Sequence, residues 1–203
     1  VKVRSEDISG ELAGKSAIVI GPGLGQDEQS RALLGEILEK SAVPVLIDAD
    51  GLNIIADEPE LLQRGEGVKI LTPHPGEMAR LCKVSSKEIQ SNRLRFAKKL
   101  AQESGAWVVL KGNKTIIASP DNEIWFNTID SPALSVAGSG DVLSGIIGSL
   151  LAQGYTVEES CLMGVNLHGR CGRLIAEDIG TVSSKAEDII EALTAVIRGE
   201  TNV

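Results

Sequence analysis

The sequence predicts an α/β fold with a mostly parallel central sheet, helices on both faces and an antiparallel hairpin near one edge. Short aliphatic segments alternate along the chain with longer segments whose apolar residues recur at helical spacing. Such alternation joins parallel strands by crossovers that cover both faces of a sheet. The chain has 203 residues and a hydrophobic fraction of 42%, which fits one globular domain over residues 1–203.

The strands are predicted from short runs rich in Val, Ile and Leu, each followed by turn residues. The parallel strands are expected at 16–20, 43–47, 68–71 and 107–110. Segments 116–118 and 124–126 flank a Pro-Asp-Asn turn, and this pattern predicts the antiparallel hairpin.

Helix positions follow from apolar spacing and from capping signals. Apolar spacing predicts a helix over 28–40 and a short acidic helix after Asn53. Three pairs are expected to be capping boxes: Ser85/Glu88, Thr156/Glu159 and Ser184/Glu187. The helices that they start are expected to end near Glu103, Asp178 and Arg198, and Gly105 is expected to stop the first of them.

The composition argues against several classes of partner. A net charge of −8 and an aromatic content of 2% disfavour nucleic acid and anionic membranes, which bind basic surfaces. The three cysteines have no metal-ligand spacing, and their odd number disfavours a disulfide framework. No signal peptide or apolar run of membrane-spanning length is visible, so the cytoplasm is the expected compartment.

The most informative stretch is Val136-Ala-Gly-Ser-Gly-Asp141, which runs into an apolar helix that Gly154 is expected to end. Gly138 and Gly140 allow the backbone to approach a ligand closely. The first amides of a helix lack internal partners and carry its positive dipole end, so this turn is suited to bind an anion. Asp141 has two interpretations, a residue that caps the helix or a base beside a bound phosphate.

Four unusual segments follow directly after the predicted parallel strands. They are 21–25, 48–53, 72–77 and 111–115. The carboxyl ends of parallel strands share one edge of the sheet, where α/β proteins bind ligands. We therefore expect these segments to meet the turn before Asp141, and this convergence favours the functional interpretation of Asp141.

Considered one at a time, the residues of these loops also have purely structural interpretations. The glycine-rich segment 21–25 lacks the Lys-Ser/Thr ending of a P-loop and also fits a tight strand-to-helix turn. Asp48 and Asp50 either form Asx turns or hold magnesium through water, and the turn is slightly favoured for Asp48 taken alone. Glu77 also fits the first turn of a helix after Gly76.

The two histidines and Lys111 also have structural and ligand-binding interpretations. His74 stands between two prolines that stiffen its loop, which favours it as a ligand contact. His168 lies within an apolar helical pattern and is expected to be structural. Lys111 is a solvated side chain by default, and a point-charge clamp if it faces a phosphate.

Five segments together resemble the ADP/ATP-dependent NAD(P)H-hydrate dehydratases of the ribokinase-like superfamily: GPGLG, DADGLN, LTPHPGEMARL, VVLKGNKT and AGSGDVLSGIIGSLLAQG. The resemblance runs from about Ser16 to about Leu193, and the histidine loop is its most specific element. It implies a ribokinase-like fold and a lyase that repairs hydrated NADH or NADPH. In this reaction ADP or ATP, assisted by Mg²⁺, phosphorylates the hydrate hydroxyl, and phosphate is then eliminated. Relatives often form tetramers, which implies a homo-oligomer.

The resemblance also implies roles for individual residues. Asp141 takes the proton of the hydroxyl and contacts the hydrate, whose site Gly23 and His74 also line. The amides of Gly138, Ser139 and Gly140 neutralise charge on the transferred phosphoryl group. The nucleotide contacts are Lys111, Gly112, Asn113, Lys114, Thr115 and Gly140. No residue is assigned to the metal.

Two departures from the family pattern are visible. Ser131-Pro-Ala133 and Val136-Ala-Gly138 stand where the family usually has Asn-Pro-Gly and Thr-Gly-Gly. The family's N-terminal strand, glycine-rich turn and alanine-rich helix have no counterpart before segment 21–25, which predicts a C-terminal part of a longer protein or a truncated member. The sequence does not decide whether this chain is active alone or whether it uses ADP or ATP. It also does not decide whether an epimerase domain lies upstream.

Two alternatives to the dehydratase remain. The first is a ribokinase-like kinase that phosphorylates a small alcohol such as a vitamin precursor and releases a stable phosphate ester. The second is a non-catalytic nucleotide-binding module. The histidine loop favours the dehydratase over the kinase, because other ribokinase-like kinases share the Gly-Ser-Gly-Asp turn but not this loop.

Overall fold

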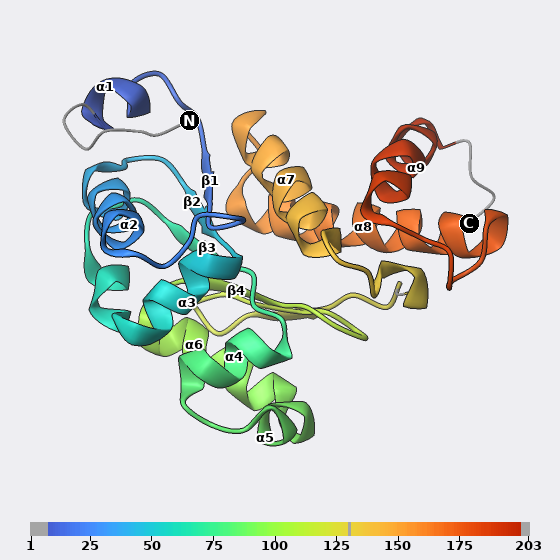
Figure 1. Ribbon diagram of the computed structural model, residues 1–203, viewed down its shortest axis with the longest axis horizontal. Coiled ribbons are helices and arrows are strands. Elements are labelled where there is room, and N and C mark those ends of the chain that lie inside the picture. Colours follow the sequence, from blue (N-terminus) through green and yellow to red (C-terminus); the bar gives the residue numbers. More distant parts are fainter. Residues whose placement is uncertain (1–7, 130, 200–203) are drawn as a thin grey trace.

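A mainly parallel sheet runs through the centre of the protein (Figure 1). The computed structural model describes residues 8–129 and 131–199. Within them, the strands pair in the order β1-β2-β3-β4-β5-β6. The strands are β1 (Ile18–Ile20), β2 (Val45–Ile47), β3 (Lys69–Leu71), β4 (Trp107–Leu110), β5 (Ile116–Ala118) and β6 (Ile124–Phe126). β1 to β4 are parallel, whereas β5 pairs antiparallel with both β4 and β6, so the predicted fold class and hairpin are confirmed.

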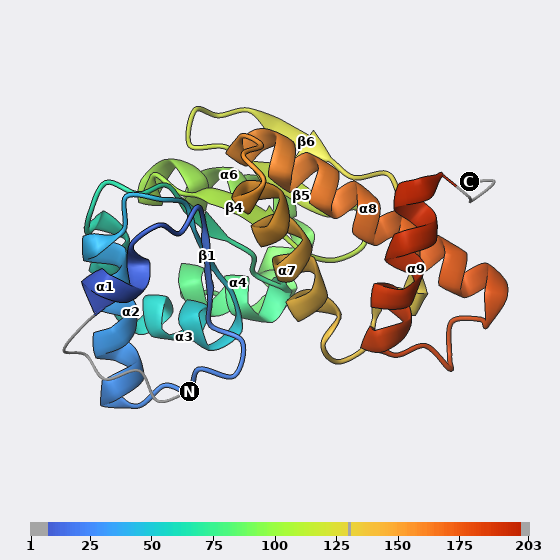
Figure 2. The ribbon, with the colours of Figure 1, turned by 90° about the horizontal axis from the view of Figure 1, so that it is seen from above.

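Each face of the sheet packs against its own layer of helices, because successive side chains of a strand point to opposite faces (Figures 1 and 2). Ile47, Leu71 and Val108 pack into the first layer. This layer contains α1 (Ile8–Leu12), α2 (Glu28–Lys40), α3 (Ala49–Asp57), α4 (Pro75–Cys82), α5 (Ser86–Ser91) and α6 (Arg93–Ser104). Leu46 and Ile70 pack against α7 (Ser139–Ala152) and α8 (Val157–Asp178) on the opposite face.

A third apolar cluster lies beyond the sheet, where α9 (Ala186–Arg198) packs against the second half of α8 (Figure 2). Buried Cys171 and Ile175 of α8 meet Ile189 and Val196 of α9 there. Cys161, also buried, belongs to the layer of α7 and α8. None of the helices in the described parts of the chain is long and apolar enough to cross a membrane.

The structure corrects the position of the acidic helix. It was expected after Asn53, but α3 begins at Ala49. The reason is that the Asp48 side chain accepts a hydrogen bond from the Ala49 backbone N–H and caps the helix directly at the end of β2. The segment 48–53 is therefore a helix start and not a loop.

Two further helix predictions need correction. The helix expected over 85–103 breaks at Asn92, whose φ of −143° is not helical, into α5 and α6. The Ser184/Glu187 box is wrong by one residue, because the Lys185 backbone N–H donates to Asp188 and α9 begins at Ala186. Ser184 instead donates its hydroxyl to the Ala133 carbonyl, which ties the start of α9 to a 3₁₀ turn at Pro132–Leu134.

Ser85 caps α5 by accepting a hydrogen bond from the Glu88 backbone N–H, but the return bond of the predicted capping box is missing among the described residues. The other capping and stop signals are confirmed. Thr156 and Glu159 form a reciprocal capping box at the start of α8. Gly105 adopts a left-handed conformation with a φ of +69° at the end of α6. Gly154, with a φ of +92°, follows the last residues of α7. Local signals thus place most of the helix ends correctly.

Candidate functional site

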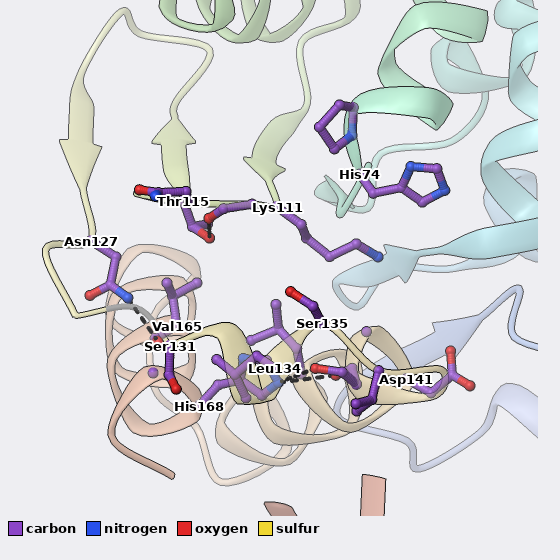
Figure 3. A pocket seen from close by; sticks show the side chains of 18 of the residues that line it. His74, Lys111, Thr115, Asn127, Ser131, Leu134, Ser135, Asp141, Val165 and His168 are labelled. Atoms are coloured by element: carbon purple, nitrogen blue, oxygen red, sulfur yellow. Dashed lines mark hydrogen bonds between the residues drawn. The ribbon is translucent and has the colours of Figure 1, made fainter. Parts of the chain in front are cut away.

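The carboxyl ends of β2, β3 and β4 open into a cavity of about 820 Å³ whose opposite wall is the N-terminus of α7 (Figure 3). The predicted site residues that line it are His74, Lys111, Gly112, Asn113, Thr115, Ser139, Gly140 and Asp141. The expected convergence is therefore present for segments 48–53, 72–77 and 111–115, whereas no residue of segment 21–25 lines the cavity. Gly23, Lys114 and Gly138 do not line this cavity.

The N-terminal turn of α7 has the geometry expected of an anion site. Gly138 occupies the cap position in a left-handed conformation, with a φ of +83° that non-glycine residues rarely adopt. A Cβ on Gly140 would lie 2.9 Å from the Lys111 Nζ, so glycine allows this cation to sit against the turn. The helix has no side-chain capping hydrogen bond. Asp141 is exposed in the first turn and lines the cavity, so the bond that its capping interpretation requires is missing among the described residues.

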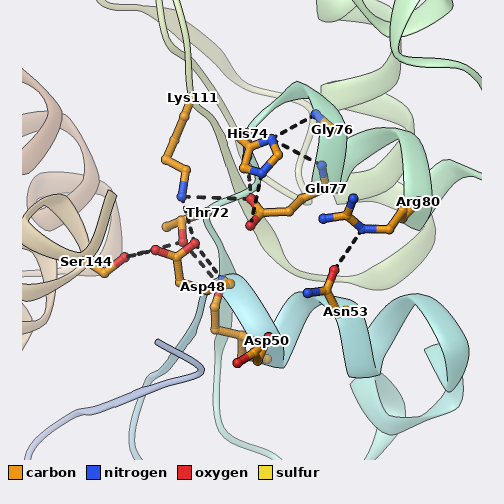
Figure 4. A network of polar contacts seen from close by, with 12 residues as sticks. Asp48, Asp50, Asn53, Thr72, His74, Gly76, Glu77, Arg80, Lys111 and Ser144 are labelled. Atoms are coloured by element: carbon orange, nitrogen blue, oxygen red, sulfur yellow. Dashed lines mark hydrogen bonds and ion pairs between the residues drawn. The ribbon is translucent and has the colours of Figure 1, made fainter. Parts of the chain in front are cut away.

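A buried ion pair lies at the ends of β2 and β4, on the wall of the cavity that faces α7 (Figure 4). The Lys111 Nζ lies 2.7 Å from the Asp48 Oδ1, and the Asp48 side chain is only 1% exposed. The Ser144 hydroxyl of α7 donates to the other Asp48 oxygen at 2.7 Å. Thr72, at the end of β3, lies 3.5 Å from the same hydroxyl. Asp48 therefore links the ends of β2 and β4 to α7.

His74 and Glu77 form the third part of the site, as a reciprocal capping box at the start of α4. The His74 Nδ1 accepts hydrogen bonds from the Gly76 and Glu77 backbone N–H groups, and a Glu77 oxygen accepts from the His74 N–H at 2.7 Å. Because Nδ1 is an acceptor, the hydrogen of the neutral imidazole is on Nε2. This nitrogen lies 3.4 Å from Glu77, and half of the His74 side chain is exposed toward the cavity.

Burial and charge shift the pKa values of this pair in opposite directions. Partial burial, followed by the positive charges of Lys111 and Arg80, lowers the pKa of His74. Burial raises the pKa of Glu77, although Lys111 and the His74 N–H partly oppose it. The 3.4 Å approach to Glu77 does not protonate His74, because desolvation and the nearby cations outweigh it. A neutral His74 is therefore available as a hydrogen-bond donor at neutral pH.

The end of the cavity away from Asp141 combines apolar side chains with polar ones such as Asn127 and Ser131 (Figure 3). Ile129, Leu134 and Val165 line it. The Asn127 side-chain amide donates to the backbone carbonyls of Ile129 and Val165 and so fixes the segment that follows β6. His168 of α8 lies beneath the α7 turn, where it is 8% exposed and contacts Ser139. Its burial agrees with its place in an apolar helical pattern, but it also lines the cavity.

The two acidic residues after β2 serve different parts of the structure. Asp50 accepts hydrogen bonds from the Gly25 backbone N–H and the Gln26 side chain, so it braces the glycine-rich segment. Asp48 faces Lys111 instead, and the two carboxylates do not form a shared site. Across the described ranges, no group of three or more His, Cys, Asp or Glu side chains is placed to hold a metal ion.

Sequence reasoning missed the importance of Asp48 and the contribution of Ser144. Ser144 is fully buried on the apolar face of α7, between Leu143 and Ile147 of the core. A lone hydroxyl on the buried face of a helix indicates a polar partner, because burial without one is costly. This signal was present in the sequence, but its partner lies far away in the chain.

Solved structures first define the class of fold. A ribokinase-like superfamily protein from Enterococcus faecalis V583 matches with a TM-score of 0.75 and 25% identity over 90% of this chain and 63% of its own. The ADP/ATP-dependent NAD(P)H-hydrate dehydratase from Bacillus subtilis, co-crystallised with ATP and Mg²⁺ and soaked with CoA, matches with a TM-score of 0.82. It is 34% identical over 92% of this chain and 67% of its own. The ribokinase-like fold is thereby confirmed.

Sequence comparison then identifies the family. The family model for NAD(P)H-hydrate dehydratase matches residues 3–195, and the chain belongs to this family. The ADP-dependent (S)-NAD(P)H-hydrate dehydratase of Neisseria meningitidis serogroup B is 46% identical over 81% of this chain and 57% of its own. The chain spans only part of its curated relatives. It covers 35% of the length of a bifunctional NAD(P)H-hydrate repair enzyme from Moorella thermoacetica and 57% of the length of the Neisseria enzyme.

Proposed function

We propose that this chain carries NAD(P)H-hydrate dehydratase activity, converting hydrated NADH or NADPH back to the reduced cofactor with ADP or ATP as co-substrate. The observation that supports it most is one cavity that brings together the α7 turn, Asp141, Lys111 and His74. Family membership supports the reaction class. The names of the relatives support an adenine nucleotide, since one is ADP-dependent and another was crystallised with ATP and Mg²⁺.

The nucleotide binds, in this proposal, along the wall from the α7 turn to the end lined by Val165. Its phosphates meet the Gly140 amide and the segment 111–115, in which Lys111 supplies a positive charge next to the helix N-terminus. Ile129, Leu134 and Val165 offer an apolar surface for the flat base. In this acidic protein, the first amides of α7, which have no partner within the helix, supply the local positive potential that an anion needs.

The chemistry begins when the hydrate hydroxyl attacks the terminal phosphorus of the nucleotide. A new O–P bond forms, the bond from phosphorus to the leaving nucleotide breaks, and the hydroxyl proton passes to the Asp141 carboxylate. The ring C–O bond of the resulting phosphate ester then breaks, phosphate leaves with the electron pair and the ring loses a proton to restore the double bond. His74 and Asp141 contact the hydrate, and Gly23 stays a predicted contact outside the cavity lining.

The residues present fit a magnesium ion carried by the nucleotide. Mg²⁺ is commonly held by one or two carboxylates together with substrate phosphates and water. Asp141 is an exposed carboxylate that lines the same cavity as the phosphate-binding turn, whereas both oxygens of Glu77 already face His74. When bound, the ion would neutralise charge on the phosphates.

The proposal is tested by incubating the chain with NADH hydrate, Mg²⁺ and either ADP or ATP while the nicotinamide absorbance is followed. Recovery of NADH that requires a nucleotide supports the dehydratase. In a parallel incubation with a small alcohol in place of the hydrate, a stable phosphate ester, without NADH recovery in the first incubation, would favour the kinase alternative. Nucleotide binding without turnover of either substrate would favour the non-catalytic module.

We further propose a cytoplasmic homo-oligomer, with a tetramer as one possible form. The cytoplasm is where reduced nicotinamide cofactors and adenine nucleotides meet. Exposed apolar side chains on α9, with Ile190 57% and Ile197 65% exposed, offer surface for association. Sedimentation at several concentrations tests the assembly, and a monomer at all of them would refute it.

A further inference from the structure

His168 is buried directly under the N-terminal turn of α7, which the proposed function uses as its phosphate site (Figure 3). Its Nε2 lies 3.1 Å from the Ser139 carbonyl oxygen and 3.1 Å from the Ser139 hydroxyl. The histidine comes from α8 and the serine from the first position of α7. The imidazole therefore connects the two helices at the point where the turn begins.

The carbonyl contact determines which nitrogen of His168 carries the hydrogen. A carbonyl oxygen only accepts hydrogen bonds, so the Nε2 must be the donor. The serine hydroxyl shares the same hydrogen or directs its own elsewhere. Burial lowers the pKa of His168 to about 4, although the Ser139 carbonyl opposes this shift, so the ring is neutral at neutral pH. One tautomer of the neutral imidazole thus satisfies the contact.

The Ser139 carbonyl belongs to the same peptide group as the Gly140 N–H. In a trans peptide these two groups point in opposite directions, so a partner that fixes the carbonyl also fixes the direction of the N–H. The N–H groups in the first turn of a helix point beyond its N-terminus. For α7 this direction leads into the cavity, which Gly140 lines close to Lys111.

We propose that His168 is a positioning residue that orients the Gly140 N–H toward a phosphate group through its hydrogen bond to the Ser139 carbonyl. The identity of that phosphate rests on the proposed function, whereas the orientation of the peptide group does not. Donation to the carbonyl also polarises the peptide group and strengthens its N–H as a donor. Ser139 thereby contributes to phosphate binding through its backbone carbonyl, and its hydroxyl contributes less to the orientation of the Gly140 N–H.

The test uses two variants of His168 and one control. His168→Gln places an amide donor near the position of the Nε2, and His168→Leu fills the space without a donor. Cys171→Ala removes a buried atom one turn further along α8 and away from the cavity, so it reports general loosening of that helix. Each variant is examined by the ¹H and ¹⁵N chemical shifts of the Gly140 amide, by binding of Mg²⁺-ADP and by kcat and KM.

We expect His168→Leu to shift the Gly140 amide and to weaken Mg²⁺-ADP binding about tenfold, the size of one lost hydrogen bond of about 1.4 kcal/mol. His168→Gln should restore both, and Cys171→Ala should change neither. The proposal is overturned if the Gly140 amide stays at its wild-type shift in His168→Leu, or if Cys171→Ala weakens binding equally.

Two further outcomes are distinguishable. If the wild-type chain binds neither Mg²⁺-ADP nor Mg²⁺-ATP, the proposed function fails, while the Gly140 amide shift still decides the role of His168. If His168→Leu does not fold, the ¹⁵N spectrum of the wild-type imidazole decides, because hydrogen on Nε2 supports the proposal and hydrogen on Nδ1 refutes it.

Discussion

The two walls of the cavity carry their acidic side chains in contrasting environments. At the ends of β2, β3 and β4, Asp48 is buried and bonded to Lys111 and Ser144. On the facing wall, Asp141 of α7 is exposed, and no ion pair of the described residues involves it. A carboxylate whose oxygens are already bonded fixes the geometry of a site, whereas an exposed one is free to accept a proton from a substrate. We infer that Asp48 builds the site and that Asp141 performs its chemistry.

The largest effect on stability is expected from Asp48→Asn. The substitution keeps the size of the side chain but leaves the Lys111 ammonium, with 17% of its side chain exposed, without its main counter-charge. Breaking a buried pair by removing one partner typically costs about 3–5 kcal/mol. Unfolding in urea measures this loss.

The matched control for Asp48→Asn is Arg31→Gln. Arg31 pairs with Asp57 and Glu58 on the surface, where the three side chains are 28–60% exposed. Exposed pairs contribute at most about 1 kcal/mol each. Equal losses in the two variants would show that the Asp48 pair is an ordinary surface interaction.

A smaller effect is expected from pH, through His168. Burial lowers the pKa of His168 to about 4 in the folded protein, from 6.5. Between these values the unfolded chain binds a proton that the folded chain does not, so the free energy of unfolding decreases as the pH falls through this window. The full decrease amounts to about 3 kcal/mol, and it is complete below the folded pKa.

The His168 contribution is isolated by comparing wild-type and His168→Gln protein between pH 4 and 7, the window set by the shifted pKa. Burial lowers the pKa of His74, which adds a dependence of the same sign, and raises that of Glu77, which opposes it. Both residues are present in both proteins, so their contributions cancel in the difference. A difference that does not change with pH would show that His168 titrates normally.

The smallest of these effects on stability is expected from nucleotide binding. It tests whether the α7 turn and segment 111–115 form the nucleotide site. A ligand at ten to a hundred times its dissociation constant stabilises a protein by about 1.4–2.7 kcal/mol. For a domain of this size, the melting temperature should rise by roughly 3–10 °C with Mg²⁺ and ADP or ATP. Nicotinamide mononucleotide should change it much less. No shift with either adenine nucleotide at millimolar concentration would refute the assignment of this wall.

The same contrast explains how much of the site was predictable from the sequence. The alternation of strands and helices predicted the sheet edge, and the turn before Asp141 had a local signature, so both were found. Asp48 and Ser144 are 96 positions apart in the chain, and their hydrogen bond depends on how α7 packs over the sheet. Single-residue reasoning favoured a turn for Asp48, because nothing local indicates that its side chain is buried beside Lys111.

The helix boundaries show a similar limit. Thr156 and Glu159 cap α8 as predicted, because both partners lie within four residues of each other. Ser184 has an equally good local signal, but a more distant acceptor, the Ala133 carbonyl, binds its hydroxyl and moves the cap to Lys185. Tertiary contacts therefore override local capping signals where a second partner is within reach.

The role of Asp141 as the base is tested by the substitution Asp141→Asn. Asparagine keeps the size of the side chain and its place in the first turn of α7 but does not accept the hydroxyl proton. A positioned general base typically contributes about 10²–10⁴ in rate, or roughly 2.7–5.5 kcal/mol of barrier. A capping role predicts a stability loss of at most about 1 kcal/mol, since Asn caps nearly as well as Asp.

The measurement is the rate of NADH recovery from its hydrate, together with the melting temperature and Mg²⁺-ADP binding, for wild-type and Asp141→Asn protein. We expect melting and nucleotide binding close to those of the wild type, with the recovery rate reduced at least about a hundredfold. A variant that melts several degrees lower but repairs the cofactor at close to the normal rate would contradict the claim and make Asp141 a helix cap.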